Sequence, residues 1–221
     1  MKKTNTLALL GLALAATVGL ASCDNGPNGP SYDTYINFAT LTGDTGKSCS
    51  FEVQKSNADA PVTLTANVEL NSTFNIGNRY VIYYSNENAG PFAAGPISLE
   101  SAFAPLGGVA TITEADSISV LTSDRINVMY VNNVSKWLDV QASAYLSNGP
   151  KAFGVFVDKA TVTEEYPEAY IGFRTDNMGA AQQWIFYGSF DITPIKRLPN
   201  AKGINLTYTT NNTKTTQKID F

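Results

Sequence analysis

The cysteine at position 23 has the surroundings of a lipidation site. Leu20, Ala21 and Ser22 precede it, so one branched apolar residue and two small residues stand before the thiol. The small side chains suit a signal peptidase pocket, and the thiol can carry diacylglycerol. We therefore predict cleavage before Cys23 and attachment of the mature protein to a lipid bilayer through acyl chains, palmitate among them, on this residue.

The first 22 residues have the features of a cleaved signal peptide. Met1-Lys2-Lys3 forms a basic start, and the stretch from Leu7 to Leu20 is apolar and free of charge. This apolar stretch is shorter than the roughly 20 residues that cross a bilayer core, which favours cleavage over a retained helix. Removal of residues 1–22 leaves 199 of the 221 residues. Residues 23–30, rich in Asn, Gly and Pro, have no apolar side chain to bury after Cys23 and are predicted to form a tether.

Composition excludes several kinds of chemistry. The chain has no histidine, which removes Ser-His-Asp and Cys-His catalysis and every zinc site that uses imidazole. Without Lys2 and Lys3, 13 basic and 19 acidic residues remain, a net charge of −6. This excess of acid opposes binding to nucleic acid. We predict no catalytic residue, no metal site and no cofactor.

The second cysteine, Cys49, is expected to be structural. Lipidation of Cys23 leaves Cys49 as the only thiol, so no intramolecular disulfide can form. Cys49 begins the alternating run 49–53, which is typical of a strand, and a small apolar side chain in such a run is usually buried. Packing alone must therefore stabilise the fold.

Two motifs resemble functional sites but have structural interpretations. Residues 43–48 hold Gly, Lys and Ser as a phosphate-binding loop does, but position 41 is Leu41 rather than the required glycine, and a strand follows instead of a helix. We interpret this segment as a hairpin turn with an exposed Lys47. The carboxylates of Glu164, Glu165 and Glu168 could serve a glycosidase only if two of them faced each other, and we interpret them as a solvated turn.

Aromatic and charged side chains in the second half supply the candidate ligand-binding residues. Trp137 and Trp184 could stack on sugar faces, although core packing uses the same residues. Arg174 and Asp176 are two residues apart on one predicted strand and could form an ion pair or contact a ligand. These four residues form the predicted binding set.

Apolar residues recur mostly at every second position from Tyr32 onward. This spacing is typical of half-buried β-strands, and Val, Ile, Thr, Tyr and Phe dominate the runs. Clusters of Gly, Asn, Asp and Pro separate the runs and predict turns. Strands are predicted at 35–41, 49–54, 62–70, 79–85, 126–131, 137–146, 152–157, 169–175, 183–192, 204–209 and 216–221. The fold class is therefore all-β, with at most one short helix, near 98–103.

A domain boundary is expected near residue 110. Pro105-Leu106-Gly107-Gly108 interrupts the strand pattern, and the polar run 111–117 follows it. We predict one domain at 31–108 and a second at 110–221.

The order of these features resembles the NigD-like lipoproteins of Gram-negative gut and oral bacteria. The similarity covers nearly the whole mature chain and rests on a lipobox, a tether and the segments 77–84, 124–128, 136–140, 169–177 and 189–192. It implies an OB-like barrel at 31–108 followed by a β-sandwich at 110–221. Relatives would carry histidine after the arginine at position 174, where this chain has Thr175, so no role of that imidazole is carried over. The family takes its name from a bacteriocin operon whose lipoprotein was suggested to give immunity.

We predict a non-enzymatic role at the cell envelope, either in binding or in protection. An immunity-like role is one form of this protection. The partners are the bilayer, through acylated Cys23, and an envelope protein or a glycan. Two alternatives stay open, a carbohydrate-binding accessory lipoprotein and a glycoside hydrolase that uses carboxylates. The resemblance favours the outer over the inner membrane and leaves open whether the body faces the periplasm or the cell surface.

Overall fold

Three β-sheets form the framework of the described part of the chain. The computed structural model describes residues 33–86, 90–122, 126–146, 150, 152–175 and 178–221. The predicted signal peptide, the tether with Cys23, and Asp176 lie outside the described residues. Fifteen strands and two short α-helices are present in the described part, which confirms the all-β fold class.

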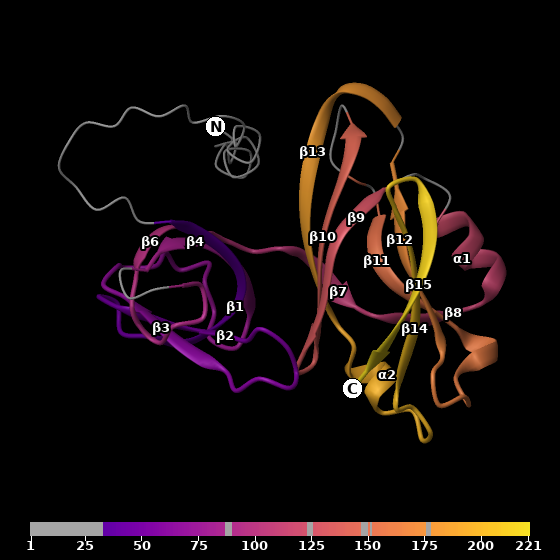
Figure 1. Cartoon of the computed structure of the whole chain (residues 1–221), viewed down its shortest axis with the longest axis horizontal. Coiled ribbons are helices and arrows are strands. Elements are labelled where there is room, and N and C mark those ends of the chain that lie inside the picture. The colour runs from indigo at the N-terminus through magenta and orange to yellow at the C-terminus, as the bar shows by residue number, and fades with distance from the viewer. Residues whose placement is uncertain (1–32, 87–89, 123–125, 147–149, 151, 176–177) are drawn as a thin grey trace, which may run out of the picture.

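The first part of the molecule is a barrel, drawn in indigo to magenta in Figure 1. Its strands are β1 (Thr34–Asp44), β2 (Cys49–Val53), β3 (Val62–Ala66), β4 (Arg79–Ser85), β5 (Gly95–Pro96) and β6 (Ser98–Phe103). The sheet order is β5-β3-β2-β1-β4-β6, with β5 parallel to β3 and β6 antiparallel to β4. Only Ile97 separates β5 from β6, so one segment pairs with both ends of the sheet and closes it. This is the strand pairing of an OB-type barrel.

Alternation along the strands decides what fills the barrel. In β2, Cys49, Phe51 and Val53 point inward and are fully buried, and Ser50 and Glu52 point outward. Burial, followed by the nearby charge of Asp44, raises the pKa of the Cys49 thiol. The interpretation of Cys49 as a buried structural residue is therefore confirmed.

The helix predicted near 98–103 is wrong, because this segment is the strand β6. Its register with β4 shifts between Tyr83 and Tyr84, and Leu99 and Ala102 pack against the barrel core. Closure of the barrel gives the backbone of β6 its hydrogen-bond partners. The pairing with β4 therefore overrides the local preference of a short segment.

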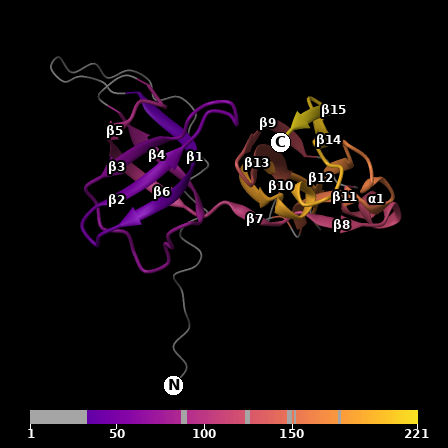
Figure 2. The same cartoon turned by 90° about the horizontal axis from the view of Figure 1, so that it is seen from below.

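The second part is a sandwich of two sheets, which lie side by side in Figures 1 and 2. One sheet has the order β7-β13-β10-β9 and the other the order β15-β14-β12-β11-β8. The elements are β7 (Leu106–Val109), β8 (Thr111–Thr113), α1 (Ala115–Leu121), β9 (Asn127–Val134), β10 (Trp137–Leu146), β11 (Ala152–Asp158), η2 (Lys159–Thr161), β12 (Glu168–Arg174), β13 (Met178–Asp191), α2 (Thr193–Lys196), β14 (Gly203–Thr210) and β15 (Thr213–Asp220).

The sandwich core lies between these sheets. Every second residue of β10, from Leu138 to Leu146, is buried there, and Phe173 of β12 and Leu206 of β14 enter from the opposite sheet. Ala110 is the single residue between β7 and β8, so the chain passes from one sheet to the other at this point. Because β7 pairs with β13, residues 106–108, which the predicted first domain includes, lie in the sandwich.

Helix α1 covers the outer face of the five-stranded sheet, at the side of the sandwich away from the barrel (Figure 1). It follows β8 within the segment that the sequence suggested was a polar connection. Gly172 permits its close approach, because a Cβ there would lie 3.0 Å from the carbonyl oxygen of Leu121 and 2.4 Å from the ring of Phe156. The sheet face beside α1 is left partly open.

Candidate functional site

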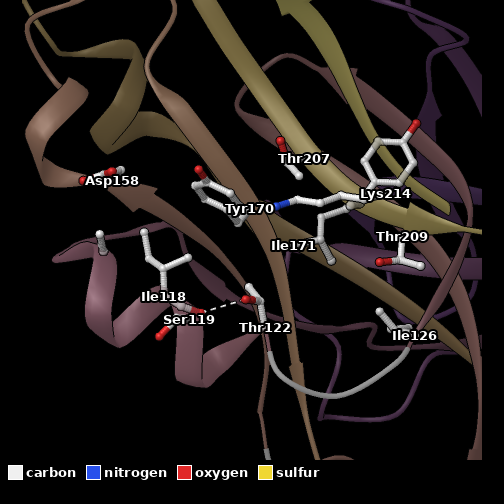
Figure 3. A pocket seen from close by; sticks show the side chains of 12 residues that line it. Ile118, Ser119, Thr122, Ile126, Asp158, Tyr170, Ile171, Thr207, Thr209 and Lys214 are labelled. Atoms are coloured by element: carbon white, nitrogen blue, oxygen red, sulfur yellow. Dashed lines mark hydrogen bonds between the residues drawn. The ribbon is translucent and has the colours of Figure 1, made fainter. Parts of the chain in front are cut away.

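A cavity of about 330 Å³ lies between α1 and the outer face of the five-stranded sheet (Figure 3). Its walls are formed by helix α1, by the strands β11, β12, β14 and β15, and by Thr122 and Ile126, which follow α1. The lining residues are Ala115, Ile118, Ser119, Thr122, Ile126, Asp158, Tyr170, Ile171, Thr207, Tyr208, Thr209 and Lys214. We call this the α1 cavity.

The two-residue period of the strands places side chains in the α1 cavity. In β12, Ala169, Ile171 and Phe173 are buried in the sandwich, so Tyr170 points outward. Thr207 and Thr209 point outward from β14 in the same way, and Lys214 of β15 is the direct cross-strand partner of Thr209. From the other side, Ile118 is the buried residue of α1 and supplies an apolar wall.

The charges of the α1 cavity come from one lysine and one aspartate. The Lys214 Nζ lies 5.8 Å from the centroid of the Tyr170 ring and forms no ion pair with any described residue. Asp158 accepts a hydrogen bond of 2.9 Å from the Ala160 amide and keeps its second oxygen free of described partners. Burial first, then the nearby Glu168 and Asp158, raises the pKa of Tyr170. The phenol therefore stays neutral and can both donate and accept.

Hydroxyl groups line the rest of the α1 cavity. Ser119 donates to the Asp116 carbonyl at 2.7 Å, and Thr122 donates to the Ile118 carbonyl at 2.9 Å. Their protons are used within the helix, so their oxygens are free to accept hydrogen bonds from a ligand. The Thr207 hydroxyl shares a bond of 2.8 Å with Thr216. The cavity thus combines hydroxyls, a ring, a cation and an anion.

The α1 cavity lacks the pair of carboxylates that a glycosidase uses. Asp158 is the only carboxylate among the residues that line the α1 cavity, whereas a glycosidase needs two that face each other. Within the described part of the chain, no three His, Cys, Asp or Glu side chains gather to hold a metal ion.

The structure separates the two predicted tryptophans. Trp184 pairs with Ala144, on the sandwich face of β10, and its indole NH donates to the Leu146 carbonyl at 2.9 Å. Trp137 lies on the opposite face, seven residues along β10 from Ala144, or about 24 Å at 3.4 Å per residue. The Lys136 ammonium covers its ring at 4.6 Å. Trp137 and Trp184 therefore cannot contact one small ligand.

Arg174 is exposed at the end of β12, on the same face as Tyr170 but four residues away. Asp176, the predicted partner of Arg174, lies outside the described residues. The predicted lipidation residue, Cys23, also lies outside them. The α1 cavity itself was not predicted. Its only signal in the sequence was the outward position of Tyr170 in the run 169–175.

The segment 43–48 has the structural role that the sequence indicates. Residues 43 and 44 end β1, and the turn that leads to β2 is closed by a hydrogen bond of 2.9 Å from the Thr45 amide to the Ser48 carbonyl, with Lys47 exposed. Glu165 is exposed, as predicted, in an ion pair of 2.5 Å with Lys202, but Glu168 is not in a solvated turn: it begins β12, is half-buried and accepts from Asn205 at 3.0 Å. Their carboxylates have structural partners rather than each other.

The tyrosines of β4 point to both sides of the strand. Tyr80 and Tyr84 point into the barrel core and are buried. Tyr83 points outward, and its hydroxyl lies 3.1 Å from that of Tyr187 in the sandwich. Tyr83 therefore takes part in the contact between the barrel and the sandwich.

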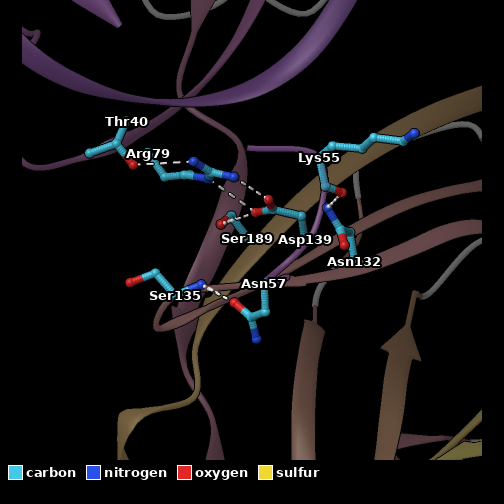
Figure 4. Close-up of polar contacts among 8 residues, drawn as sticks. All are labelled: Thr40, Lys55, Asn57, Arg79, Asn132, Ser135, Asp139 and Ser189. Carbon is cyan, nitrogen blue, oxygen red and sulfur yellow. Dashed lines mark hydrogen bonds and ion pairs between the residues drawn. The ribbon is translucent and has the colours of Figure 1, made fainter. Parts of the chain in front are cut away.

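A buried ion pair joins the barrel to the sandwich (Figure 4). Arg79 of β4 donates to Asp139 of β10 through Nη2 at 2.5 Å and Nε at 3.3 Å, and the exposed fractions of the side chains are 4% and 1%. Ser189 donates to Asp139 at 2.6 Å, and the Arg79 Nη1 donates to Thr40 at 3.1 Å. Each charge is thus paired and further hydrogen-bonded, as a buried ion pair requires.

Rings and backbone contacts extend this contact between the two parts. The Tyr187 ring meets Phe38 and Phe103 edge to face, with centroids 6.0 and 5.8 Å away. At the other end, Asn132 donates to the Lys55 carbonyl at 3.0 Å, and the Ser135 amide donates to Asn57 at 2.7 Å. We call this set, with Arg79 and Asp139 at its centre, the domain interface.

Comparison with known proteins gives a consistent fold. No known family model matches the chain, and no curated protein matches it. A solved structure of a NigD-like immunity protein from Bacteroides caccae has a TM-score of 0.59 and 14% identity over 85% of this chain and 93% of that one. The chain has the NigD-like fold. The NigD-like fold predicted from the sequence resemblance is therefore confirmed, apart from the bounds of its two domains.

Two further solved structures are similar to this NigD-like fold. A protein of unknown function from Bacteroides vulgatus has a TM-score of 0.63 and 12% identity, covering 86% of this chain and 91% of its own. A Bacteroides fragilis protein with a provisional lipoprotein assignment has a TM-score of 0.58 and 12% identity, covering 85% of this chain and 98% of its own.

Proposed function

We propose that this chain is a membrane-anchored, non-enzymatic binding protein of the cell envelope, with a protective, immunity-like role. The lipobox that ends at Cys23 supports the anchor. The NigD-like immunity protein and the B. fragilis protein share its fold and support the envelope setting. In the described part of the chain, no helix has the length and apolar character needed to cross a membrane.

The observation that carries the binding role is the α1 cavity. It brings together groups from α1 and four strands, including an ammonium group and a phenol without hydrogen-bond partners among the described residues. Groups of this kind lose little free energy when a ligand replaces the water around them, and they gain directed contacts with the ligand. The domain interface holds the sandwich that carries the cavity firmly on the barrel, which is the part next to the tether.

The anchor is tested by metabolic labelling with palmitate in a strain that makes the full precursor. We expect label in the wild-type protein and none in the Cys23→Ala variant, together with release of that variant from the membrane fraction. Separation of inner and outer membranes then tests the proposed outer-membrane location. Labelled Cys23→Ala protein would contradict the lipidation proposal.

The binding role is tested by affinity purification of the lipidated protein from detergent-solubilised membranes, with a glycan array beside it. We expect a specific protein or glycan ligand that is lost in the cavity variant Tyr170→Ala and kept in Tyr166→Ala, whose ring lies outside the cavity. If neither assay yields a ligand that depends on Tyr170, the proposed site of binding is wrong.

A further inference from the structure

We infer that the α1 cavity binds a single hexose unit that carries a carboxylate, as in the uronic acid residues of glycans. This inference rests on the proposed binding function and names its ligand class. The volume of about 330 Å³ lies at the small end of the ~300–1,000 Å³ typical of small-molecule sites, which suits a single sugar ring.

The walls of the α1 cavity match the two kinds of surface of a sugar. Ile118 and the Tyr170 ring supply apolar surface for the C–H faces of a pyranose ring. Ser119 and Thr122 offer acceptor oxygens, because their own protons are bonded within α1. The free oxygen of Asp158 adds a charged acceptor, which forms the stronger hydrogen bonds with sugar hydroxyls.

The ammonium of Lys214 indicates that the ligand carries a negative charge. Figure 3 shows its side chain extending across the sheet toward Tyr170, inside the ring of lining residues. The neighbouring Lys218 on the same face of β15 instead covers the Tyr166 ring at 3.6 Å, outside the cavity. Lys214 thus differs from Lys218 in facing an open polar volume.

The balance of charges favours a carboxylate over a phosphate. Among the lining residues, one cation and one anion are present, and arginine, whose planar guanidinium matches phosphate, is missing. A phosphate with two charges would meet Asp158 as well as Lys214 and would be repelled by the net charge of −6 on the mature chain. A carboxylate on a hydroxyl-rich ring matches one ammonium, one carboxylate and several hydroxyls.

The test titrates the lipidated full-length mature protein in detergent with D-glucuronate, D-galacturonate, D-glucose, acetate and inorganic phosphate, using calorimetry and saturation-transfer NMR. We expect at least one uronate to bind about tenfold more tightly than glucose, because the charge-assisted contact is absent in the neutral sugar. Acetate and phosphate, which lack the ring or the charge match, should bind more weakly than that uronate.

Three variants locate the binding. Lys214→Met should weaken the uronate about tenfold and leave glucose unchanged, and Tyr170→Ala should weaken both sugars. The matched control Lys218→Gln should keep uronate affinity within about twofold. Folding of each variant is checked by its unfolding transition, so a loss of binding is not mistaken for a loss of structure.

The outcomes separate this inference from the proposed function. Uronate affinity that is unchanged in Lys214→Met, or phosphate bound more tightly than both uronates, would overturn the acidic-sugar inference. A neutral glycan or protein ligand that depends on Tyr170 would also overturn it, but would leave the binding function intact. Absence of any ligand that depends on Tyr170 would overturn both.

Discussion

The domain interface and the α1 cavity are both polar, but their polar groups are arranged in opposite ways. At the interface, Arg79 and Asp139 are almost fully buried and share hydrogen bonds with Thr40 and Ser189. In the cavity, the Lys214 ammonium forms no ion pair with a described residue and lies 5.8 Å from the centroid of the Tyr170 ring. A polar group that the protein has already satisfied holds the structure together, and a polar group left open is available to a ligand.

The largest effect is expected from breaking the buried ion pair. Asp139→Ala leaves the Arg79 guanidinium buried without its partner, which should lower the free energy of unfolding by about 3–5 kcal/mol. Urea unfolding followed by tryptophan fluorescence measures the change. The control is Glu114→Ala, which removes one partner of an exposed ion pair with Lys159 and should not move the midpoint.

A double variant sharpens this result. Arg79→Met with Asp139→Leu removes both charges and should be more stable than Asp139→Ala, because no charge is left buried and unpaired. A double variant as unstable as the single one would show that the hydrogen bonds to Thr40 and Ser189, rather than the charge pair, stabilise the interface.

A smaller effect is expected from the hydroxyl of Tyr187. This phenol lies 3.1 Å from the Tyr83 hydroxyl and accepts from Gln141 at 3.4 Å, and burial raises its pKa above the usual range of tyrosine. Tyr187→Phe keeps the ring and removes these contacts, so the free energy of unfolding should fall by about 1 kcal/mol. The control is Tyr145→Phe, which changes an exposed tyrosine of β10 on the same face of the sheet and should have no effect.

Asp191 is less buried than the ion pair of the domain interface but has more hydrogen-bond partners than Lys214 in the α1 cavity. Its stabilising effect is expected to depend on pH. Partial burial opposes ionisation, but hydrogen bonds from Thr193 and the nearby Lys136 outweigh it and lower the pKa of Asp191. A carboxyl group whose pKa is lowered by folding stabilises the fold at every pH above its pKa in the unfolded state, which is about 4. This contribution disappears as the pH falls through the lower pKa of the folded state.

The variant Asp191→Ala measures this contribution. Its free energy of unfolding should be lower by about 0.5 kcal/mol at pH 7, because the Asp191 carboxylate accepts a hydrogen bond from the Thr193 amide at the start of α2. Thermal unfolding of both proteins from pH 2 to 7 should show that the difference shrinks below pH 4. A difference that is independent of pH would assign the effect to packing.

The smallest effect on stability is expected in the α1 cavity. Lys214→Met should change the free energy of unfolding by less than about 0.5 kcal/mol, because Lys214 is exposed and has no ion pair with a described residue. The same urea titrations measure it. A large loss of stability would show that Lys214 is structural and would remove the contrast between the two regions.

The strands were predictable because alternation depends only on neighbours in the chain. The ranges predicted for 79–85 and 137–146 agree with β4 and β10. The two polar regions were not predictable, since Arg79 and Asp139 are 60 residues apart and meet only after both domains dock. The α1 cavity depends in the same way on the register of β15 against β14 and on the helix α1, which the sequence did not indicate.

The buried pair of Arg79 and Asp139 also has a consequence for the proposed lipid anchor. The predicted tether of eight residues would reach at most about 28 Å, and with the two domains locked the body beyond it would turn as one piece. Figure 1 shows α1 at the end of the sandwich opposite the barrel. In the proposed anchored protein, the barrel would act as a rigid spacer, and the α1 cavity would move through the outer part of a shell above the bilayer, where it would meet molecules from solution.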